Sequence, residues 1–306
     1  MTVPPSGEHG GDARAVAAAL GLGRADVIEL SASLNPLAPD VRPFAAAALD
    51  AVADYPDPAD ATARLADAIG VDDDRLVLTN GGAEAIALVA AELGEGWIVE
   101  PEFSLYRRHL RRVRPGAPRW RSDPSNPLGR LAGPDEVAAV RDEAFYPLST
   151  GRWTSPVDDG SWRIGSLTKL GACPGIRLGY VVAPDATRAE AVRARRPRWS
   201  VGAVALGIVA PALALTDLGG WSRGVAELRD DLAGRLRALG FLVDAADAPW
   251  LLVRGRDGLR ERLAHERVVV RDAASFGLHG TVRVAVPRPG DVDDVVRAFA
   301  VAGGGT

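Results

Sequence analysis

The sequence predicts an α/β protein with a large domain built on a mostly parallel sheet and a smaller α+β domain. Two observations carry this prediction. Residues 75–99 read as strand, Gly-rich turn, helix and strand, which is the pattern of a βαβ unit. After Trp199 the pattern changes to long Ala/Leu/Val helices, four short apolar segments and a final helix. We therefore expect an N-terminal segment at 1–30, packed near the functional site or forming a small domain, a large domain at 31–202 and a small domain at 203–306.

The expected elements alternate along the large domain and change order in the small one. Helices are expected at residues 13–20, 44–52, 60–69, 83–93, 103–112, 204–215 and 221–239, with one more at the C-terminal end. Strands are expected at residues 27–30, 75–78, 97–99, 162–165, 178–183, 241–243, 251–254, 268–271 and 282–286. Turn-rich sequences such as YPDP at 55–58 and TNGG at 79–82 separate neighbouring elements. The Pro- and Arg-rich residues 113–125 favour no single element.

Composition excludes several classes of function. The net charge of −4 gives no reason to expect nucleic acid or an anionic membrane as a partner. Cys173 is the only cysteine and the four histidines show no paired ligand spacing, so neither an intramolecular disulfide nor a metal site is expected. No apolar run approaches the ~20 residues that span a bilayer, and the N-terminus lacks the pattern of a signal peptide. The cytoplasm is the expected location.

The densest chemical signal is RIGSLTKLGACPGIRLGYVVAP at 163–184. A lysine just past a strand end can have its ammonium desolvated, which favours the neutral amine that forms imines. Ser166 and Arg177 would supply a hydroxyl and a guanidinium suited to a phosphate near Lys169. Taken alone, Lys169 could equally be a surface lysine on a turn. Ser-x-x-Lys also occurs in penicillin-binding proteins and class A β-lactamases, but the Ser-Asp-Asn and Lys-Thr-Gly motifs that those enzymes need downstream are missing from this sequence.

The segment resembles the lysine motif of class I/II aminotransferases, above all the histidinol-phosphate aminotransferases and the threonine-phosphate decarboxylases. Companion motifs follow in family order from about residue 8 to 300. They are HGG at 9–11, SASLNPLAP at 31–39, YPDP at 55–58, NGGAEAI at 80–86, PEFSLY at 101–106, SNPLG at 125–129, DEAF at 142–145, VVVRDAASFGL at 268–278 and TVRVAVP at 281–287. The resemblance implies fold type I of the pyridoxal 5′-phosphate (PLP) enzymes, the fold of aspartate aminotransferase, with Lys169 carrying PLP as a Schiff base.

The resemblance also assigns residues to the phosphate of the cofactor. Gly82 and Ala83 would present backbone N–H groups at a helix start, together with Ser166 and Arg177. The alternative at Gly82 and Ala83 is an ordinary turn between strand and helix. Tyr55 would reach the phosphate of the neighbouring subunit, which implies a homodimer with shared active sites.

Three further residues would contact the cofactor ring. Phe103 would stack on the pyridine, and Asn126 would donate to the phenolic oxygen. Asp142, a catalytic residue with Lys169, would pair with the pyridine nitrogen and keep it protonated, which makes the ring an electron sink. Without the resemblance, these would be a core aromatic, a turn asparagine and an aspartate in a surface loop. Only residues 127–141 separate Asn126 from Asp142, where the family normally fits a helix and a strand, and this leaves a non-catalytic protein of the same fold as an alternative.

The expected substrate is a phosphorylated amino acid or amine. Arg283 would hold the α-carboxylate as a bidentate pair, unless it is a surface arginine at a strand edge. The expected contacts of the substrate phosphate are Arg271, His9 and Asn35. HGG, SASLNPLAP and Phe145, which replaces the usual tyrosine, favour a decarboxylase that converts O-phospho-L-threonine to aminopropanol phosphate in cobalamin biosynthesis. An aminotransferase acting on histidinol phosphate or an aromatic amino acid is the alternative, because the two reactions differ only in which Cα bond the pocket sets perpendicular to the ring.

Overall fold

The computed structural model describes residues 2–7, 9–156, 159–255 and 257–304. The chain forms two compact units, and each is described by itself. The central unit comprises Ala38–Asn126 and Leu131–Ser222, and the terminal unit comprises Met1–Leu37, Pro127–Arg130 and Arg223–Thr306. The bounds of these compact units differ from the domain boundaries expected at residues 30 and 202. The expected domain boundaries stay a prediction.

The central unit contains a seven-stranded sheet in the order β2-β8-β7-β6-β5-β3-β4. Its strands are β2 (Leu76–Thr79), β3 (Glu95–Ile98), β4 (Arg112–Val113), β5 (Arg119–Ser122), β6 (Val140–Asp142), β7 (Trp162–Ser166) and β8 (Gly179–Val182). Its helices are α2 (Arg42–Ala47), α3 (Ala59–Ile69), α4 (Gly81–Leu93), α5 (Ser104–His109), α6 (Tyr146–Thr150), α7 (Leu167–Leu170), α8 (Ala186–Arg195), α9 (Ala203–Gly207) and α10 (Val209–Ala214). Strand β8 runs antiparallel to β2 and β7, and the others run parallel. The predicted mostly parallel sheet is confirmed.

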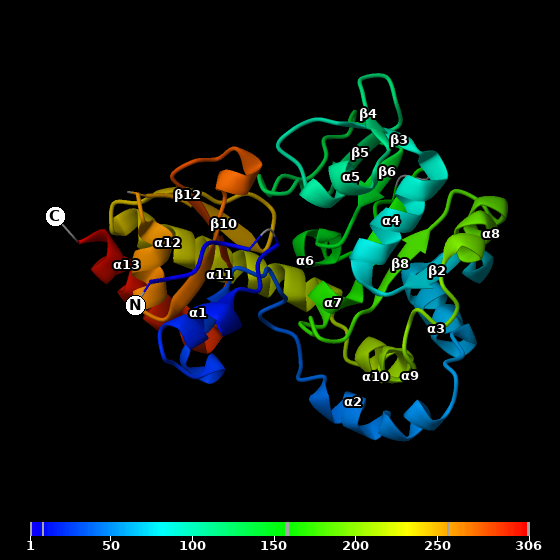
Figure 1. Cartoon of the computed structure of the whole chain (residues 1–306), viewed down its shortest axis with the longest axis horizontal. Helices are drawn as coiled ribbons and strands as arrows, with labels where there is room; N and C mark the ends of the chain where they lie inside the picture. The colour runs from blue at the N-terminus through cyan, green and yellow to red at the C-terminus, as the bar shows by residue number, and fades with distance from the viewer. Residues whose placement is uncertain (1, 8, 157–158, 256, 305–306) are drawn as a thin grey trace. The chain divides into compact units, whose positions relative to one another are not determined.

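Helices cover both faces of this sheet (Figure 1). Val77 of β2 and Val181 of β8 pack in a buried cluster with α4 and α8. Their strand neighbours Leu78 and Tyr180 pack in a second buried cluster with α3. Because successive side chains of a strand point to opposite faces, the two clusters lie on opposite sides of the sheet. Burial on both faces explains why these strands read as continuous apolar runs in the sequence.

Two expected helices are interrupted. The helix expected at 204–215 is divided at Ile208 into α9 and α10. Pro211 lies within α10, lacks an N–H and cannot donate to the carbonyl of Gly207, so a continuous helix would lose that hydrogen bond. The helix expected at 44–52 is α2 followed by a 3₁₀ segment at Leu49–Ala53. Nothing in the structure explains this second break.

Two inner strands were not expected. Strand β5 lies in the unassigned stretch 113–125, and β6 lies in the short connection before Asp142. Arg141 hides β6 in the sequence, because a charged residue is unusual inside a buried strand. The side chain of Arg141 is compensated: it donates to Asp159 at 2.9 Å and to the carbonyl of Glu136 at 3.1 Å.

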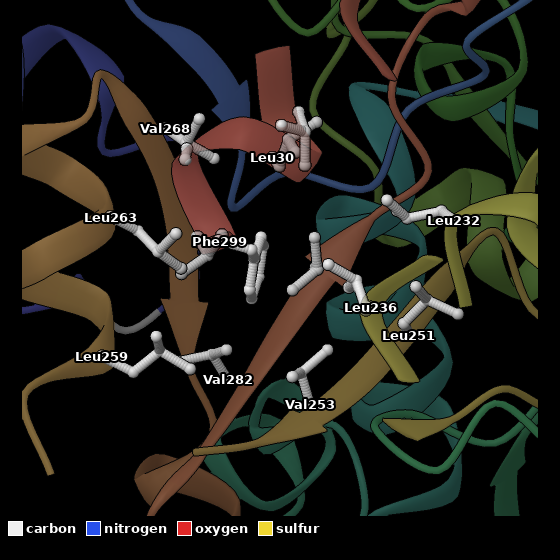
Figure 2. Close-up of a cluster of buried hydrophobic side chains, with 14 of the residues drawn as sticks. Leu30, Leu232, Leu236, Leu251, Val253, Leu259, Leu263, Val268, Val282 and Phe299 are labelled. Carbon is white, nitrogen blue, oxygen red and sulfur yellow. The ribbon is translucent and has the colours of Figure 1, made fainter. Parts of the chain in front are cut away.

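The terminal unit contains a five-stranded sheet in the order β1-β11-β12-β10-β9. Its strands are β1 (Ile28–Leu30), β9 (Leu242–Asp244), β10 (Trp250–Arg254), β11 (Val268–Asp272) and β12 (Thr281–Ala285). Its helices include α1 (Ala13–Ala19), α12 (Leu259–His265), α13 (Val292–Gly303) and the part of α11 (Leu218–Ala238) that begins at Arg223. Strand β1 pairs parallel with β11, and the other pairs are antiparallel. Figure 2 shows the core of this unit, in which Phe299 lies among leucine and valine side chains.

Within the described parts of the chain, no single helix has the length and apolar character needed to cross a membrane. One bent pair, Ala203–Ala214 with Leu218–Ala238, meets the criteria of length and composition together, with a bend of 85°.

Candidate active site

A glycine-lined cradle lies at the start of α4. Gly81 has a φ of +76°, and a Cβ there would lie 2.4 Å from a guanidinium nitrogen of Arg177. A Cβ on Gly179 would lie 2.7 Å from the backbone nitrogen of Gly82, and one on Gly82 would lie 3.9 Å from Cβ of Ser166. The structure therefore brings Gly82, Ser166 and Arg177 together, as the sequence predicts. Because the first N–H groups of a helix have no partner inside the helix, this arrangement suits an anion.

Glycines at 81 and 179 were not singled out from the sequence. Gly179 begins β8 and pairs with Thr79 of β2 and Ser166 of β7. Only a residue without a side chain can bring β8 this close to the start of α4, since a Cβ at 179 would also lie 2.6 Å from the carbonyl carbon of Gly81. The two consecutive glycines directly after β2 and Asn80 were the sequence feature that could have indicated this close approach.

Lys169 lies in α7, directly after β7 ends at Ser166. Its Nζ lies 5.7 Å from the centre of the Phe145 ring. Asp142 ends the neighbouring strand β6, and the charge of Lys169 acts on the Asp142 carboxyl. The structure therefore brings the predicted lysine and aspartate together at the carboxyl ends of two adjacent parallel strands, where α/β proteins commonly place ligands.

Asp142 is a buried carboxylate held by two hydrogen bonds. Its residue is 8% exposed, and it lies in register with Ser122 of β5 and Ile164 of β7. Tyr106 Oη donates to Oδ2 at 2.9 Å, and the Ala144 N–H donates to Oδ1 at 3.1 Å. Burial raises the pKa of Asp142, and both hydrogen bonds and the Lys169 charge oppose that rise. The short connection 127–141 thus still leaves Asp142 in a central strand, which removes the observation that favoured a non-catalytic protein.

Tyr106 was missed in the sequence. It lies three residues after Phe103, so both fall on one side of α5, and their rings meet edge to face with centres 5.8 Å apart. The signal was the spacing within PEFSLY. Phe103 directly precedes α5, and Asn126 is buried with its N–H donating to Ser122 Oγ at 2.8 Å.

Tyr55 is 78% exposed, and its ring stacks on Trp199 with centres 4.4 Å apart. The neighbouring residues Asp54 and Pro56 line a cleft of about 490 Å³ together with Asn80 and Arg177. The contact of Tyr55 with a neighbouring subunit stays a prediction.

The terminal unit holds two neighbouring buried arginines. Arg271 of β11 is paired with Arg283 of β12, and the two residues are 2% and 4% exposed. Arg283 lies over the Trp250 ring at 5.1 Å, and Arg271 lies over Phe276 at 4.6 Å. Burial, followed by the charge of Arg271, lowers the pKa of Arg283 to about 9. Neighbouring buried cations of this kind favour the binding of anions.

Gly10 and Gly11 of the HGG motif contact Ser31. A Cβ on Gly10 would lie 2.4 Å from the Ser31 carbonyl oxygen, and the Gly11 N–H donates to Ser31 Oγ at 2.8 Å. The same carbonyl accepts a hydrogen bond from Arg283 at 3.4 Å. The HGG segment and Arg283 therefore meet at one residue. His9 is exposed, whereas Asn35 is buried and accepts a hydrogen bond from the Leu37 N–H at 3.0 Å. The roles of both residues in binding the substrate phosphate stay predictions.

Comparison with known proteins settles the family. The model of the family "aminotransferase class I and II" matches residues 122–299, more than half of the chain. The chain belongs to the class I and II aminotransferases. It is 29% identical to the threonine-phosphate decarboxylase of Salmonella typhimurium, over 88% of each chain. It is also 29% identical to histidinol-phosphate aminotransferase 1 of Thiobacillus denitrificans, over 87% of this chain and 83% of that one.

A solved structure supports the predicted fold of this aminotransferase-family chain. Histidinol-phosphate aminotransferase from Sinorhizobium meliloti, determined in complex with PLP, aligns with a TM-score of 0.82 at 16% identity, over 98% of this chain and 95% of that one. The predicted aspartate-aminotransferase-like fold type I is confirmed. Members of this family are PLP-dependent enzymes, aminotransferases or decarboxylases. Among the described residues, no group of three or more His, Cys, Asp or Glu side chains could hold a metal ion.

Proposed function

We propose that this chain is a PLP-dependent decarboxylase of O-phospho-L-threonine, which releases CO2 and forms aminopropanol phosphate. The observation that carries the proposal is the pairing of Arg271 and Arg283 across β11 and β12, both buried. Guanidinium groups make strong, often bidentate hydrogen bonds to carboxylates and phosphates, so this pair suits a substrate that carries two anions. Phosphothreonine carries two anions, an α-carboxylate for Arg283 and a phosphate for Arg271. Histidinol phosphate carries a phosphate and no carboxylate.

The residues of the central unit fit PLP. The backbone N–H groups of Gly82 and Ala83, with Ser166 and Arg177, would hold its phosphate, and the glycine at 81 leaves room for the Arg177 guanidinium beside them. When bound, PLP supplies an aldehyde and an electron-withdrawing pyridinium ring that stabilises negative charge at the substrate Cα.

The chain's own groups then divide the remaining tasks. Lys169 would supply the amine that holds PLP, and that amine would also be placed to give a proton to the substrate Cα. Asp142, fixed by Tyr106, keeps a negative charge at the pyridine nitrogen. Phe103 would stack on the ring and Asn126 would donate to the phenolic oxygen.

The assembly that we propose is a homodimer with Tyr55 of each chain at the phosphate of the partner. The exposure of Tyr55, and the cleft formed by its neighbours with Arg177, support this assignment. A large exposed aromatic beside a cleft with apolar and polar lining is typical of a protein–protein contact.

Aminotransfer is the second candidate function. This candidate is supported by the sequence identity, which is 29% both to a decarboxylase and to a histidinol-phosphate aminotransferase. Reaction of the PLP-loaded protein with phosphothreonine and, separately, with histidinol phosphate distinguishes the two. We expect CO2 and aminopropanol phosphate from phosphothreonine. Stoichiometric pyridoxamine phosphate from histidinol phosphate, with no CO2 from phosphothreonine, would overturn the decarboxylase proposal.

A further inference from the structure

Glu102 is a buried glutamate between Pro101 and Phe103, and none of the roles proposed above uses it. The residue is 6% exposed. Its carboxylate accepts three hydrogen bonds: from the Phe103 N–H at 3.0 Å, from the Ser122 N–H at 2.9 Å and from Ser122 Oγ at 2.5 Å. A carboxylate only accepts hydrogen bonds, so three donors around it are well satisfied.

Ser122 extends this connection to Asn126. While its Oγ donates to Glu102, it also accepts the Asn126 N–H at 2.8 Å. Ser122 further lies in register with Asp142 on the neighbouring strand. Glu102 is therefore joined directly to Phe103 and, through one serine, to Asn126.

We propose that Glu102 is a positioning residue, which fixes Phe103 relative to Asn126 so that one can stack on the cofactor ring while the other donates to the phenolic oxygen. This inference rests on the proposed function, because that function places the ring against both residues. A fixed geometry matters there, since small displacements of contacting groups cost binding and rate.

The charge of Glu102 should matter as well as its shape. Burial raises the pKa of Glu102 to about 7; the hydrogen bonds from Ser122 and Phe103 oppose the rise and the charge of Asp142 adds to it. Tyr106 of α5 and Glu100 are further titratable groups near Glu102: the charge of Glu102 acts on the Tyr106 hydroxyl, and Glu100 Oε2 accepts the Glu102 N–H at 2.9 Å. Once protonated, one oxygen of Glu102 becomes a donor and can no longer accept every hydrogen bond that it holds. The hydrogen bonds that join Glu102 to Phe103 and Ser122 should therefore be strong at pH 8 and weak at pH 6.

The test compares Glu102→Gln with Glu143→Gln. Glutamine keeps the size of the side chain, but its NH2 group must face one of the donors around position 102. Glu143 is a matched control, because it is 2% exposed, its pKa is raised by burial to about 7, and it accepts from Thr154 and Ser155 rather than from the ring-contacting residues.

The first measurement is the Kd of PLP, followed by quenching of tryptophan fluorescence at pH 8 and pH 6. For Glu102→Gln we expect a Kd about tenfold that of the wild type at pH 8, the effect of one hydrogen bond to a charged group. At pH 6 the ratio of the variant Kd to the wild-type Kd should approach one. Other titrating groups affect both proteins equally and therefore cancel in this ratio. Glu143→Gln should give a ratio near one at both values. A ratio for Glu102→Gln near one at pH 8 would overturn the inference, and a ratio that stays near ten at pH 6 would show that Glu102 is still charged there.

The second measurement needs no cofactor. Hydrogen exchange of the apo protein should be faster at the Phe103 and Asn126 amides in Glu102→Gln, and unchanged there in Glu143→Gln. Ser122→Ala, a second variant, should accelerate exchange at Asn126 alone. A wild type that does not bind PLP would refute the proposed function, while exchange would still test the connection. Unchanged exchange at both amides in Glu102→Gln would refute the positioning role.

Discussion

Arg271 and Arg283 lie opposite each other on adjacent antiparallel strands, and both are buried. Their guanidinium groups supply positive charge and N–H donors, which make strong hydrogen bonds to carboxylates and phosphates. The pair of arginines therefore bears first on the choice of substrate.

Arg271→Ala should weaken binding of phosphothreonine about tenfold or more, because a charge-assisted hydrogen bond is worth roughly 1.5–3 kcal/mol. The same change should barely affect unphosphorylated threonine, since the contact that is lost is to the phosphate. Arg283→Ala serves as the comparison and should weaken both ligands through the carboxylate. Calorimetric titration of each ligand into the PLP-loaded variants measures these differences. Equal losses for both ligands in Arg271→Ala would indicate general damage to the site.

Lys169 should be the attachment point of PLP. After incubation with PLP and reduction with borohydride, peptide mass spectrometry should locate the label on the one peptide that contains Lys169. Lys169→Ala should lack the visible absorption band of lysine-bound PLP, because the sequence has no other lysine. Because Lys169 is the only lysine of the sequence, label elsewhere could come only from the N-terminal amine. Label on the N-terminal peptide instead, or a band that persists in Lys169→Ala, would disprove the assignment.

Tyr55 should act across a dimer. Analytical ultracentrifugation should detect a homodimer, and Tyr55→Phe should raise the Kd of PLP several-fold, because the hydroxyl to the partner's phosphate site is lost. Trp199→Ala offers a control, since it removes the stacking partner of Tyr55 and leaves the hydroxyl in place. A monomer with full activity would count against the shared site.

Stability should depend on pH through Glu143. Burial raises its pKa from 4.5 to about 7, so between these values the folded chain binds a proton that the unfolded chain releases. The free energy of unfolding should therefore fall as the pH rises through this window. Glu143→Gln removes the dependence, and its stability relative to the wild type should rise by about 3 kcal/mol across the window. Urea denaturation at pH 4.5, 6 and 8 measures this, and a constant difference would contradict it.

Much of the fold and the centre of the site could be predicted from the sequence. The β2–α4–β3 pattern was read from local periodicity, and Lys169 and Arg177 from one continuous motif. Strand β6 could not be read in this way, because the burial of Arg141 depends on partners that the fold supplies, Asp159 and the carbonyl of Glu136. The partners of a buried charge are set by tertiary structure.

The same reason applies to Tyr106 and Glu102. Each carries a polar group whose partner lies on another strand, Asp142 for the tyrosine and Ser122 for the glutamate. In the sequence they are an aromatic on a helix and an acid beside a proline. The sheet register sets Ser122 beside Asp142, and this register brings the hydrogen-bond partners of Tyr106 and Glu102 together.

The contact of Gly179 with Gly81 and Gly82 ties the anion cradle to the closure of the sheet. Strand β8 pairs with β2 at the position where it also meets the start of α4. A side chain at 81 or 179 would therefore disturb folding before it disturbed chemistry. A descendant of this chain that abandoned catalysis could lose its lysine freely, yet selection for folding alone would preserve both glycines.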